Sequence, residues 1–164
     1  MLSQLGIIED IPETGETLKE NAAIKARYIY NKYKMNCFAD DTGLEVEALN
    51  GAPGVYSARY AGPNCNFADN NEKLLLELND QNNRSARFKT VICLIVEGVE
   101  LFFEGICKGE ILRTHQGKDG FGYDPLFKPL NRDVSFAEMS TTEKNKISHR
   151  GLAVKELLKF LNKR

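Results

Sequence analysis

The sequence lacks the features that mark several broad classes of protein. Its 164 residues contain no run near the ~20 apolar residues of a membrane span. The first six residues show no basic segment followed by an apolar core, as a signal peptide would. A formal net charge of −1 gives no reason to propose a surface for nucleic acid or an anionic membrane. We therefore expect a cytoplasmic protein that binds neither nucleic acid nor membrane.

Cysteine and histidine patterns typical of metal sites are also missing. The four cysteines form no C-x-x-C pair and only two histidines are present, which argues against a zinc site. Three of the cysteines lie in apolar, strand-like runs, as is typical of reduced thiols in a cytosolic protein. The remaining composition is that of a globular protein, and its length fits a single domain over residues 1–164.

Hydrophobic spacing predicts a mixed α/β fold. Apolar residues three and four positions apart indicate helices at 17–34, 67–78 and 148–161. Apolar or β-branched runs indicate strands at 35–39, 86–97 and 100–112. The last two strands flank Gly98-Val99 and should form an antiparallel hairpin, and Gly105 indicates a bulge in the second. Because helices and strands alternate before the hairpin, a mixed sheet flanked by helices fits best.

Two adjacent acids, Asp40 and Asp41, follow the first apolar strand and precede Gly43. We expect the strand to end here, with both carboxylates facing solvent at the sheet edge. Neighbouring carboxylates repel, and a hard cation such as Mg²⁺ would remove that cost; the alternative is a solvated turn without a ligand. Glu20 could share this cation with Asp41, or it could only complete a capping box with Thr17.

Residues 120–125 combine glycines with aromatic and acidic side chains. The glycines let a flat ligand approach the backbone, while Phe121 and Tyr123 offer stacking faces. Asp124 could accept hydrogen bonds from a heterocycle. A plain turn is the alternative interpretation.

Residues 144–151 gather positive charge ahead of the last predicted helix. Lys144, His149 and Arg150 lie beside its N-terminus, where an anion held by backbone amides would favour them. The alternative is a solvated basic turn. Taken together, the three regions describe a metal site, a stacking pocket and an anion grip, which is the combination that a nucleotide requires.

Five segments also occur in an order and at a spacing typical of one protein family. They are Ile11-Pro12-Glu13-Thr14-Gly15 with Glu20-Asn21-Ala22, Ala39-Asp40-Asp41-Thr42-Gly43-Leu44, Gly51-Ala52-Pro53-Gly54-Val55-Tyr56-Ser57-Ala58-Arg59-Tyr60, Phe121-Gly122-Tyr123-Asp124-Pro125 and Glu143-Lys144-Asn145-Lys146-Ile147-Ser148-His149-Arg150-Gly151. In these segments the chain resembles the Ham1/RdgB family of inosine triphosphate pyrophosphatases over nearly its whole length.

The resemblance implies a fold, an activity and a set of site residues. The fold would be an elongated mixed α/β sheet with two lobes around a nucleotide cleft, usually as a homodimer. The activity would be hydrolysis of ITP, dITP or XTP to the nucleoside monophosphate and pyrophosphate. Glu20 and Asp41 would bind Mg²⁺, with Asp41 as the proton acceptor. The implied substrate-binding residues are Thr42, Phe121, Gly122, Tyr123, Asp124, Lys144, His149 and Arg150.

The start of the chain departs from the family's pattern. Relatives begin with a strand and a Thr-Asn-Asn-x-x-Lys loop that grips the phosphates, whereas Met1-Leu2-Ser3 matches a later strand. We therefore expect one strand–loop–helix unit to be absent and the turnover of this chain to be weak. The alternative function is a catalytically silent nucleotide-binding protein.

Overall fold

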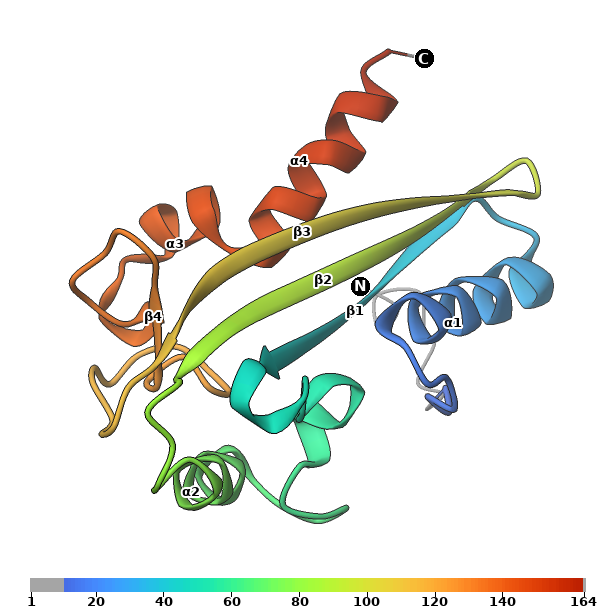
Figure 1. Ribbon diagram of the computed structural model, residues 1–164. Coiled ribbons are helices and arrows are strands. Elements are labelled where there is room, and N and C mark those ends of the chain that lie inside the picture. The colour runs from blue at the N-terminus through green and yellow to red at the C-terminus, as the bar shows by residue number, and fades with distance from the viewer. Residues whose placement is uncertain (1–10, 164) are drawn as a thin grey trace.

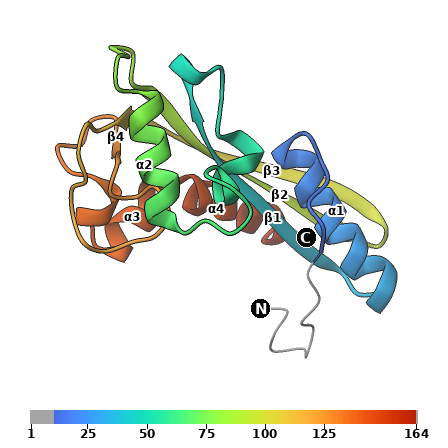
Figure 2. The ribbon, with the colours of Figure 1, turned by 90° about the horizontal axis from the view of Figure 1, so that it is seen from below.

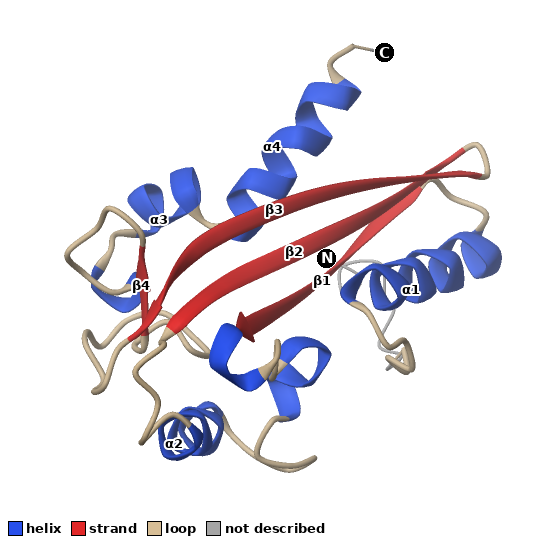
Figure 3. Ribbon diagram, viewed as in Figure 1, coloured by secondary structure: helices blue, strands red, loops and turns tan. Residues whose placement is uncertain are grey.

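The computed structural model describes residues 11–163, in which helices lie on both sides of one β-sheet (Figures 1 and 3). The match at Met1–Ser3 lies outside these residues. The α-helices are α1 (Leu18–Tyr33), α2 (Phe67–Glu77), α3 (Thr141–Ile147) and α4 (His149–Leu161). Short 3-10 helices are η2 (Glu47–Leu49), η3 (Gly54–Arg59) and η4 (Phe136–Glu138). The strands are β1 (Cys37–Val46), β2 (Ser85–Val96), β3 (Val99–Ile111) and β4 (Phe127–Pro129).

The sheet follows sequence order, β1-β2-β3-β4, and each of these pairs is antiparallel. β2 and β3 form the predicted hairpin, with an unbroken register from Ser85 opposite Glu110 to Val96 opposite Val99. Glu97 and Gly98 form its turn, with φ angles of 53° and 80°. Two positive φ angles are typical of the hairpin turn that matches strand twist.

The bulge expected at Gly105 is absent, because this residue lies opposite Thr90 in the regular register. Close packing explains the glycine instead. A Cβ here would lie 2.0 Å from the backbone oxygen of His149 and 2.4 Å from the backbone nitrogen of Ala153. The start of α4 therefore rests directly on the backbone of β3.

β1 is longer than predicted. It continues to Val46, so Asp40 and Asp41 lie within the strand and not at its end. Gly43 does not interrupt it; a Cβ at this position would lie 2.5 Å from the backbone oxygen of Gly54. Glycine therefore allows the following loop to fold back onto the strand. Because side chains alternate along a strand, the two neighbouring acids point to opposite faces of the sheet.

The two faces of the sheet are covered by different helices (Figures 1 and 2). α1 packs Ala22 and Ala26 against Val91 of β2. α4 packs Ala153 against Ile92, the next residue of the same strand. Within residues 11–163, no helix is long and apolar enough to cross a membrane.

A third core cluster closes the end of the sheet near β4. Leu74 of α2 belongs to it, together with Phe88, Phe127 and Phe136. The ring centroids of Phe88 and Phe127 lie 4.7 Å apart in an edge arrangement, a favourable geometry for aromatic pairs. This aromatic cluster supports the segment that leads to α3 and α4.

Candidate active site

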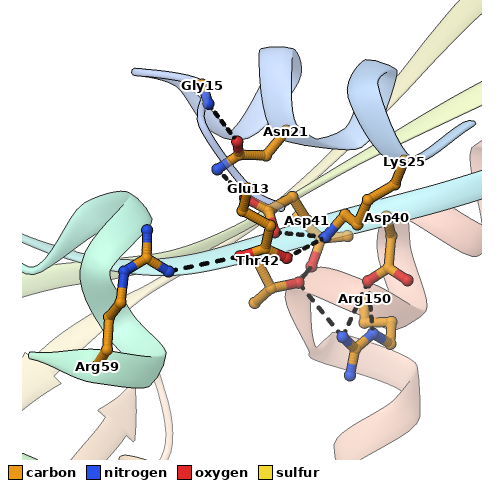
Figure 4. A network of polar contacts seen from close by, with 10 residues as sticks. Glu13, Gly15, Asn21, Lys25, Asp40, Asp41, Thr42, Arg59 and Arg150 are labelled. Atoms are coloured by element: carbon orange, nitrogen blue, oxygen red, sulfur yellow. Dashed lines mark hydrogen bonds and ion pairs between the residues drawn. The ribbon is translucent and has the colours of Figure 1, made fainter. Parts of the chain in front are cut away.

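Asp41 lies on the face of β1 that α1 covers, and its side chain is buried. Its Oδ1 accepts a hydrogen bond of 2.8 Å from Lys25 Nζ, and its Oδ2 accepts one of 3.3 Å from Asn21 Nδ2. Asn21 and Lys25 are four residues apart, so they share one face of α1. Lys25 Nζ also donates to Glu13 Oε1 at 2.8 Å. Figure 4 shows this ammonium group between the two carboxylates.

The loop ahead of α1 holds Glu13 near the strand. Gly15 N donates to Asn21 Oδ1 at 2.8 Å, so the buried amide of Asn21 connects this loop to Asp41. A Cβ on Gly15 would lie 2.7 Å from the same Asn21 oxygen, which requires glycine here. On the other side of Glu13, Oε2 lies 3.6 Å from Arg59 Nη1 of η3.

Burial and ion pairing have opposite effects on the ionisation of Asp41 and of Lys25. Burial raises the pKa of Asp41, although the bonds from Lys25 and Asn21 act in the opposite direction. For Lys25, burial alone would lower the pKa, but the hydrogen bonds to Asp41 and Glu13 outweigh it and the pKa is raised. The site therefore combines a persistent cation with a carboxylate that is more basic than an exposed aspartate.

Glu20 is engaged elsewhere. Its Oε2 accepts the backbone N–H groups of Glu16 at 2.8 Å and Thr17 at 3.0 Å, while Thr17 Oγ1 accepts the N–H of Glu20. The capping box predicted from the sequence is thus confirmed. Within residues 11–163, no group of three Asp, Glu, His or Cys side chains is placed to hold one metal ion. The acids that converge are Glu13 and Asp41.

Asp40 and Thr42 point to the opposite face of β1, toward α4. Arg150 donates to Asp40 Oδ2 from Nε at 3.2 Å and from Nη2 at 2.9 Å. The same Nη2 lies 3.5 Å from Thr42 Oγ1, which is also hydrogen-bonded to Thr90 Oγ1 at 2.7 Å. Arg150 therefore links β1 to the start of α4.

A pocket of about 450 Å³ lies between η4, α3 and the start of α4. It brings together four of the predicted substrate-binding residues: Phe121, Lys144, His149 and Arg150. Phe121 is 57% exposed, and Lys144 Nζ lies 4.7 Å from the centroid of its ring. Asp124 is buried; its carboxylate accepts the Phe121 N–H and forms an ion pair with Lys144. Asp124 thus positions both the ring and the ammonium group.

His149 forms a buried wall of this pocket. Its ring stacks on Phe88 with centroids 4.5 Å apart and planes inclined by 17°. Burial, assisted by the charges of Arg150 and Lys144, lowers its pKa to about 3, so the imidazole is neutral near pH 7. Its Nδ1 has no hydrogen-bond partner among residues 11–163. A buried polar atom without a hydrogen-bond partner costs free energy, so a ligand that forms a hydrogen bond with Nδ1 would remove that cost.

Tyr123 and Gly122 make structural contacts instead of facing the pocket. Tyr123 is buried, and its hydroxyl donates to the backbone oxygen of Ser57 at 2.9 Å. Asn71 Nδ2 of α2 donates to the backbone oxygen of Gly122 at 3.1 Å. These bonds fix the loop that presents Phe121.

Comparison with known proteins assigns the chain to a family. A sequence model described as the Ham1 family matches residues 1–160. The chain belongs to the Ham1 family. A dITP/XTP pyrophosphatase of Christiangramia forsetii is 58% identical over 162 residues, 99% of this chain and 85% of the relative. That of Porphyromonas gingivalis is 52% identical over 161 residues, 98% of this chain and 83% of the relative.

Solved structures of Ham1 proteins share the fold. The protein from Coxiella burnetii superposes with a TM-score of 0.94 at 42% identity, covering 99% of this chain and 84% of that one. The Staphylococcus aureus Ham1 protein gives a TM-score of 0.93 at 42% identity, with coverages of 98% and 84%. The α/β fold and the family expected from the sequence are therefore confirmed.

Three polar residues of this Ham1 site were missed by sequence reasoning: Glu13, Asn21 and Lys25. Glu13 and Asn21 lie in the segment used to recognise the family, but neither was singled out. The available signal was spacing, since Asn21 and Lys25 follow the same four-residue step as the neighbouring Ala22 and Ala26. Polar residues at that step, beside a buried stripe, indicate side chains directed at the sheet.

Proposed function

We propose that this Ham1 protein hydrolyses ITP, dITP and XTP to the nucleoside monophosphate and pyrophosphate, and so removes these nucleotides from the cellular pool. The observation that carries the proposal is the connection between two sites. Arg150 contacts Asp40 and Thr42 on β1 and also lines the pocket with His149. Asp41 lies between Asp40 and Thr42 in the same strand and contacts Lys25, so the pocket and the carboxylate site meet at β1, and we expect one extended ligand to reach both. The name of the relatives compared above, dITP/XTP pyrophosphatase, supports this substrate class.

The carboxylates of Glu13 and Asp41 fit a divalent cation. Each lies 2.8 Å from the Lys25 ammonium nitrogen, so they already converge on a single positive charge. Carboxylate oxygens are the ligands that Mg²⁺ prefers. We propose Mg²⁺ as the cofactor, held by Asp41 with Glu13 in the role that the resemblance implied for Glu20. When bound, this ion would withdraw charge from the phosphate oxygens.

Asp41 is the proposed proton acceptor. Burial raises the pKa of its carboxyl group, which strengthens it as a general base for the attacking water. Asn21 fixes the position of Oδ2, so the carboxylate is held in one orientation. The adjacent ammonium of Lys25 supplies positive charge for the leaving pyrophosphate.

The pocket is proposed to select the base. The exposed face of Phe121 offers a stacking surface for a purine. His149 Nδ1, in the tautomer that carries a proton there, and Arg150 would donate to the 6-keto oxygen. Adenine presents an amine donor at that position, so these donors would stay unpaired at a cost of ~1–3 kcal/mol.

Release of pyrophosphate from ITP in the presence of Mg²⁺ tests the proposal. We expect Asp41→Asn to lower turnover at least about 100-fold, because the proton acceptor is lost. Asp80→Asn, at an exposed position after α2, is the matched control and should retain the rate. A retained rate in Asp41→Asn would show that the proton acceptor is misassigned. A chain that releases no pyrophosphate from ITP would refute the function.

From the resemblance we also propose that the chain works as a homodimer in the cytoplasm. Sedimentation of the purified chain tests the first part, and a monomer at micromolar concentration would contradict it. Fluorescence imaging of the tagged protein in its own cells tests the second.

A further inference from the structure

The segment from Gly54 to Tyr60, which contains η3, has no role in the reaction as described so far. Its backbone is nevertheless held by several side chains from other parts of the fold. Donors from outside the segment bind three of its carbonyl oxygens: Tyr123 Oη on Ser57 (2.9 Å), Asn70 Nδ2 on Ala58 (3.1 Å) and Lys73 Nζ on Tyr60 (2.8 Å). A turn fixed by this many side chains is a rigid platform.

Polar side chains anchor this platform on two sides. Asn70 of α2 is 2% exposed, and its Oδ1 also accepts the backbone N–H of Ala61 at 2.7 Å. Toward the sheet, Ser57 Oγ accepts the backbone N–H of Leu44 in β1 at 2.9 Å. Burial of an asparagine is costly unless its amide is hydrogen-bonded. Here the Asn70 amide fixes the turn to α2, and Ser57 fixes it to β1, the strand that carries Asp41.

Arg59 is the charged side chain that this platform presents to the carboxylate site. Its Nη1 lies 3.6 Å from Glu13 Oε2, and its guanidinium carbon lies 5.3 Å from the centroid of the Tyr56 ring. Within residues 11–163 the structure gives the Arg59 side chain an ion pair and a ring contact but no hydrogen bond. Its N–H donors are therefore available, and a guanidinium group matches the oxygens of a phosphate.

Arg59 and Arg150 approach the carboxylates from opposite sides (Figure 4). Arg150 lines the pocket proposed for the base, whereas Arg59 stands beyond Glu13. A nucleotide that extends from this pocket past Asp41 would bring its terminal phosphates to Arg59. We propose that Arg59 binds the phosphates beyond the bond that breaks, which leave as pyrophosphate. This inference rests on the proposed function.

The charges of the site support this assignment. Without Arg59, the carboxylates of Glu13, Asp40 and Asp41 outnumber the cations of Lys25 and Arg150. That excess of negative charge repels a triphosphate. The positive charge of the Arg59 guanidinium group cancels this excess of negative charge. It does so on the side of the site where the phosphate chain of a bound nucleotide would end.

Calorimetric titration of the full chain with inorganic pyrophosphate, and separately with IMP, tests the inference in the presence of Mg²⁺. Arg59→Gln should raise the Kd for pyrophosphate by roughly 10- to 100-fold, because a charge-assisted bond is lost. The Kd for IMP should stay close to its original value. Arg27→Gln is the matched control, since Arg27 is an exposed arginine of α1 that is also paired with a carboxylate, that of Glu100. Both affinities should be unchanged in this control.

A double substitution separates phosphate binding from a role limited to holding Glu13. If Arg59 acts only through Glu13, adding Arg59→Gln to Glu13→Gln would not weaken pyrophosphate binding further, and the inference would be overturned. A further loss of about tenfold or more supports it. Unchanged pyrophosphate affinity in the single variant, or equal losses for IMP and pyrophosphate, also overturn it. Thermal unfolding of each variant verifies the fold.

Turnover of ITP by the unaltered chain, measured in parallel, keeps the two proposals apart. If ITP is hydrolysed and Arg59→Gln binds pyrophosphate normally, only the role of Arg59 fails. If ITP is not hydrolysed but pyrophosphate binding depends on Arg59, the proposed function fails and the phosphate-binding role of Arg59 remains.

Discussion

The carboxylate site beside α1 and the pocket beside α4 are built from different interactions. In the first, Lys25 lies between the carboxylates of Glu13 and Asp41, so ion pairs set the geometry. In the second, His149 is stacked on Phe88, and burial keeps its imidazole neutral. The carboxylate site thus depends on charged side chains, whereas burial in the pocket keeps the His149 ring uncharged.

This contrast matches the two ends of a nucleotide. Phosphates and a divalent cation are bound by charged side chains, such as those of Lys25, Glu13 and Asp41. A purine base requires a flat surface and a few fixed donors, as in the pocket around His149. Arg150 lines the pocket and also contacts Asp40, the neighbour of Asp41 on β1. Substitutions that affect one region without the other can therefore test whether the two are functionally separate.

The largest effect should come from Glu13, a carboxylate of the site beside α1. Glu13→Gln should lower ITP turnover at least about 100-fold, because a cation ligand is lost, while IMP affinity should change little. Glu20→Gln is the matched control. Glutamine can retain the capping-box bond to the backbone, so turnover should stay near that of the unaltered chain. The reverse result would assign the metal to Glu20.

A smaller effect, on stability, should come from the contact between α4 and β3. Gly105→Ala would place a Cβ against the backbone of His149 and Ala153. Displacing α4 should cost about 3 kcal/mol of the free energy of unfolding, measured by urea denaturation. The folded fraction should lose IMP affinity and keep pyrophosphate affinity. Glu104→Ala, on the neighbouring exposed position, should cost within about 0.5 kcal/mol; equal costs would contradict this account of the packing.

The smallest effect, taken per pH unit, concerns the ionisation of His149. Burial lowers the pKa of His149 to about 3 in the folded chain, against an ordinary value of 6.5. Below pH 6.5 the unfolded chain binds a proton that the folded chain does not, so the free energy of unfolding falls as pH falls. This contribution is up to ~1.4 kcal/mol per pH unit until pH approaches 3. It should be absent in His149→Gln, whatever the stability of that variant at pH 7.

Urea denaturation at several pH values between 4 and 7 provides the measurement. His115→Gln, which changes the exposed histidine of a loop, should retain the slope of the unaltered chain. If His149→Gln also retained that slope, the imidazole would not be held neutral by burial.

Local patterns predicted most of the elements. The stripe in α1, its capping box and the β2–β3 hairpin depend on neighbouring residues, so the sequence contains their signal. β1 and Gly105 were misread because the reason for each glycine lies far away in the chain. Gly43 makes room for Gly54, and Gly105 makes room for α4. Such contacts cannot be seen without the tertiary structure.

For the same reason, the sequence predicted the residues around the pocket but not those that approach Asp41. The residues around the pocket follow from family motifs, and four of them line one cavity. Lys25 and Glu13 approach Asp41 only once α1 has packed on the sheet. Glu13 and Glu20 both stand near the same helix start in the sequence, so only their contacts distinguish them: Glu13 contacts Lys25, and Glu20 contacts the backbone of Thr17.

The register of β1 against β2 determines which of the two neighbouring acids faces which cation. Asp40 lies opposite Ile92 and Asp41 opposite Val91, so the strand directs one acid to Arg150 and the next to Lys25. A slip of a single residue would exchange the two. Strand pairing thus determines which acid becomes the proposed proton acceptor, and on this proposal a misaligned strand would yield an inert protein of unchanged composition.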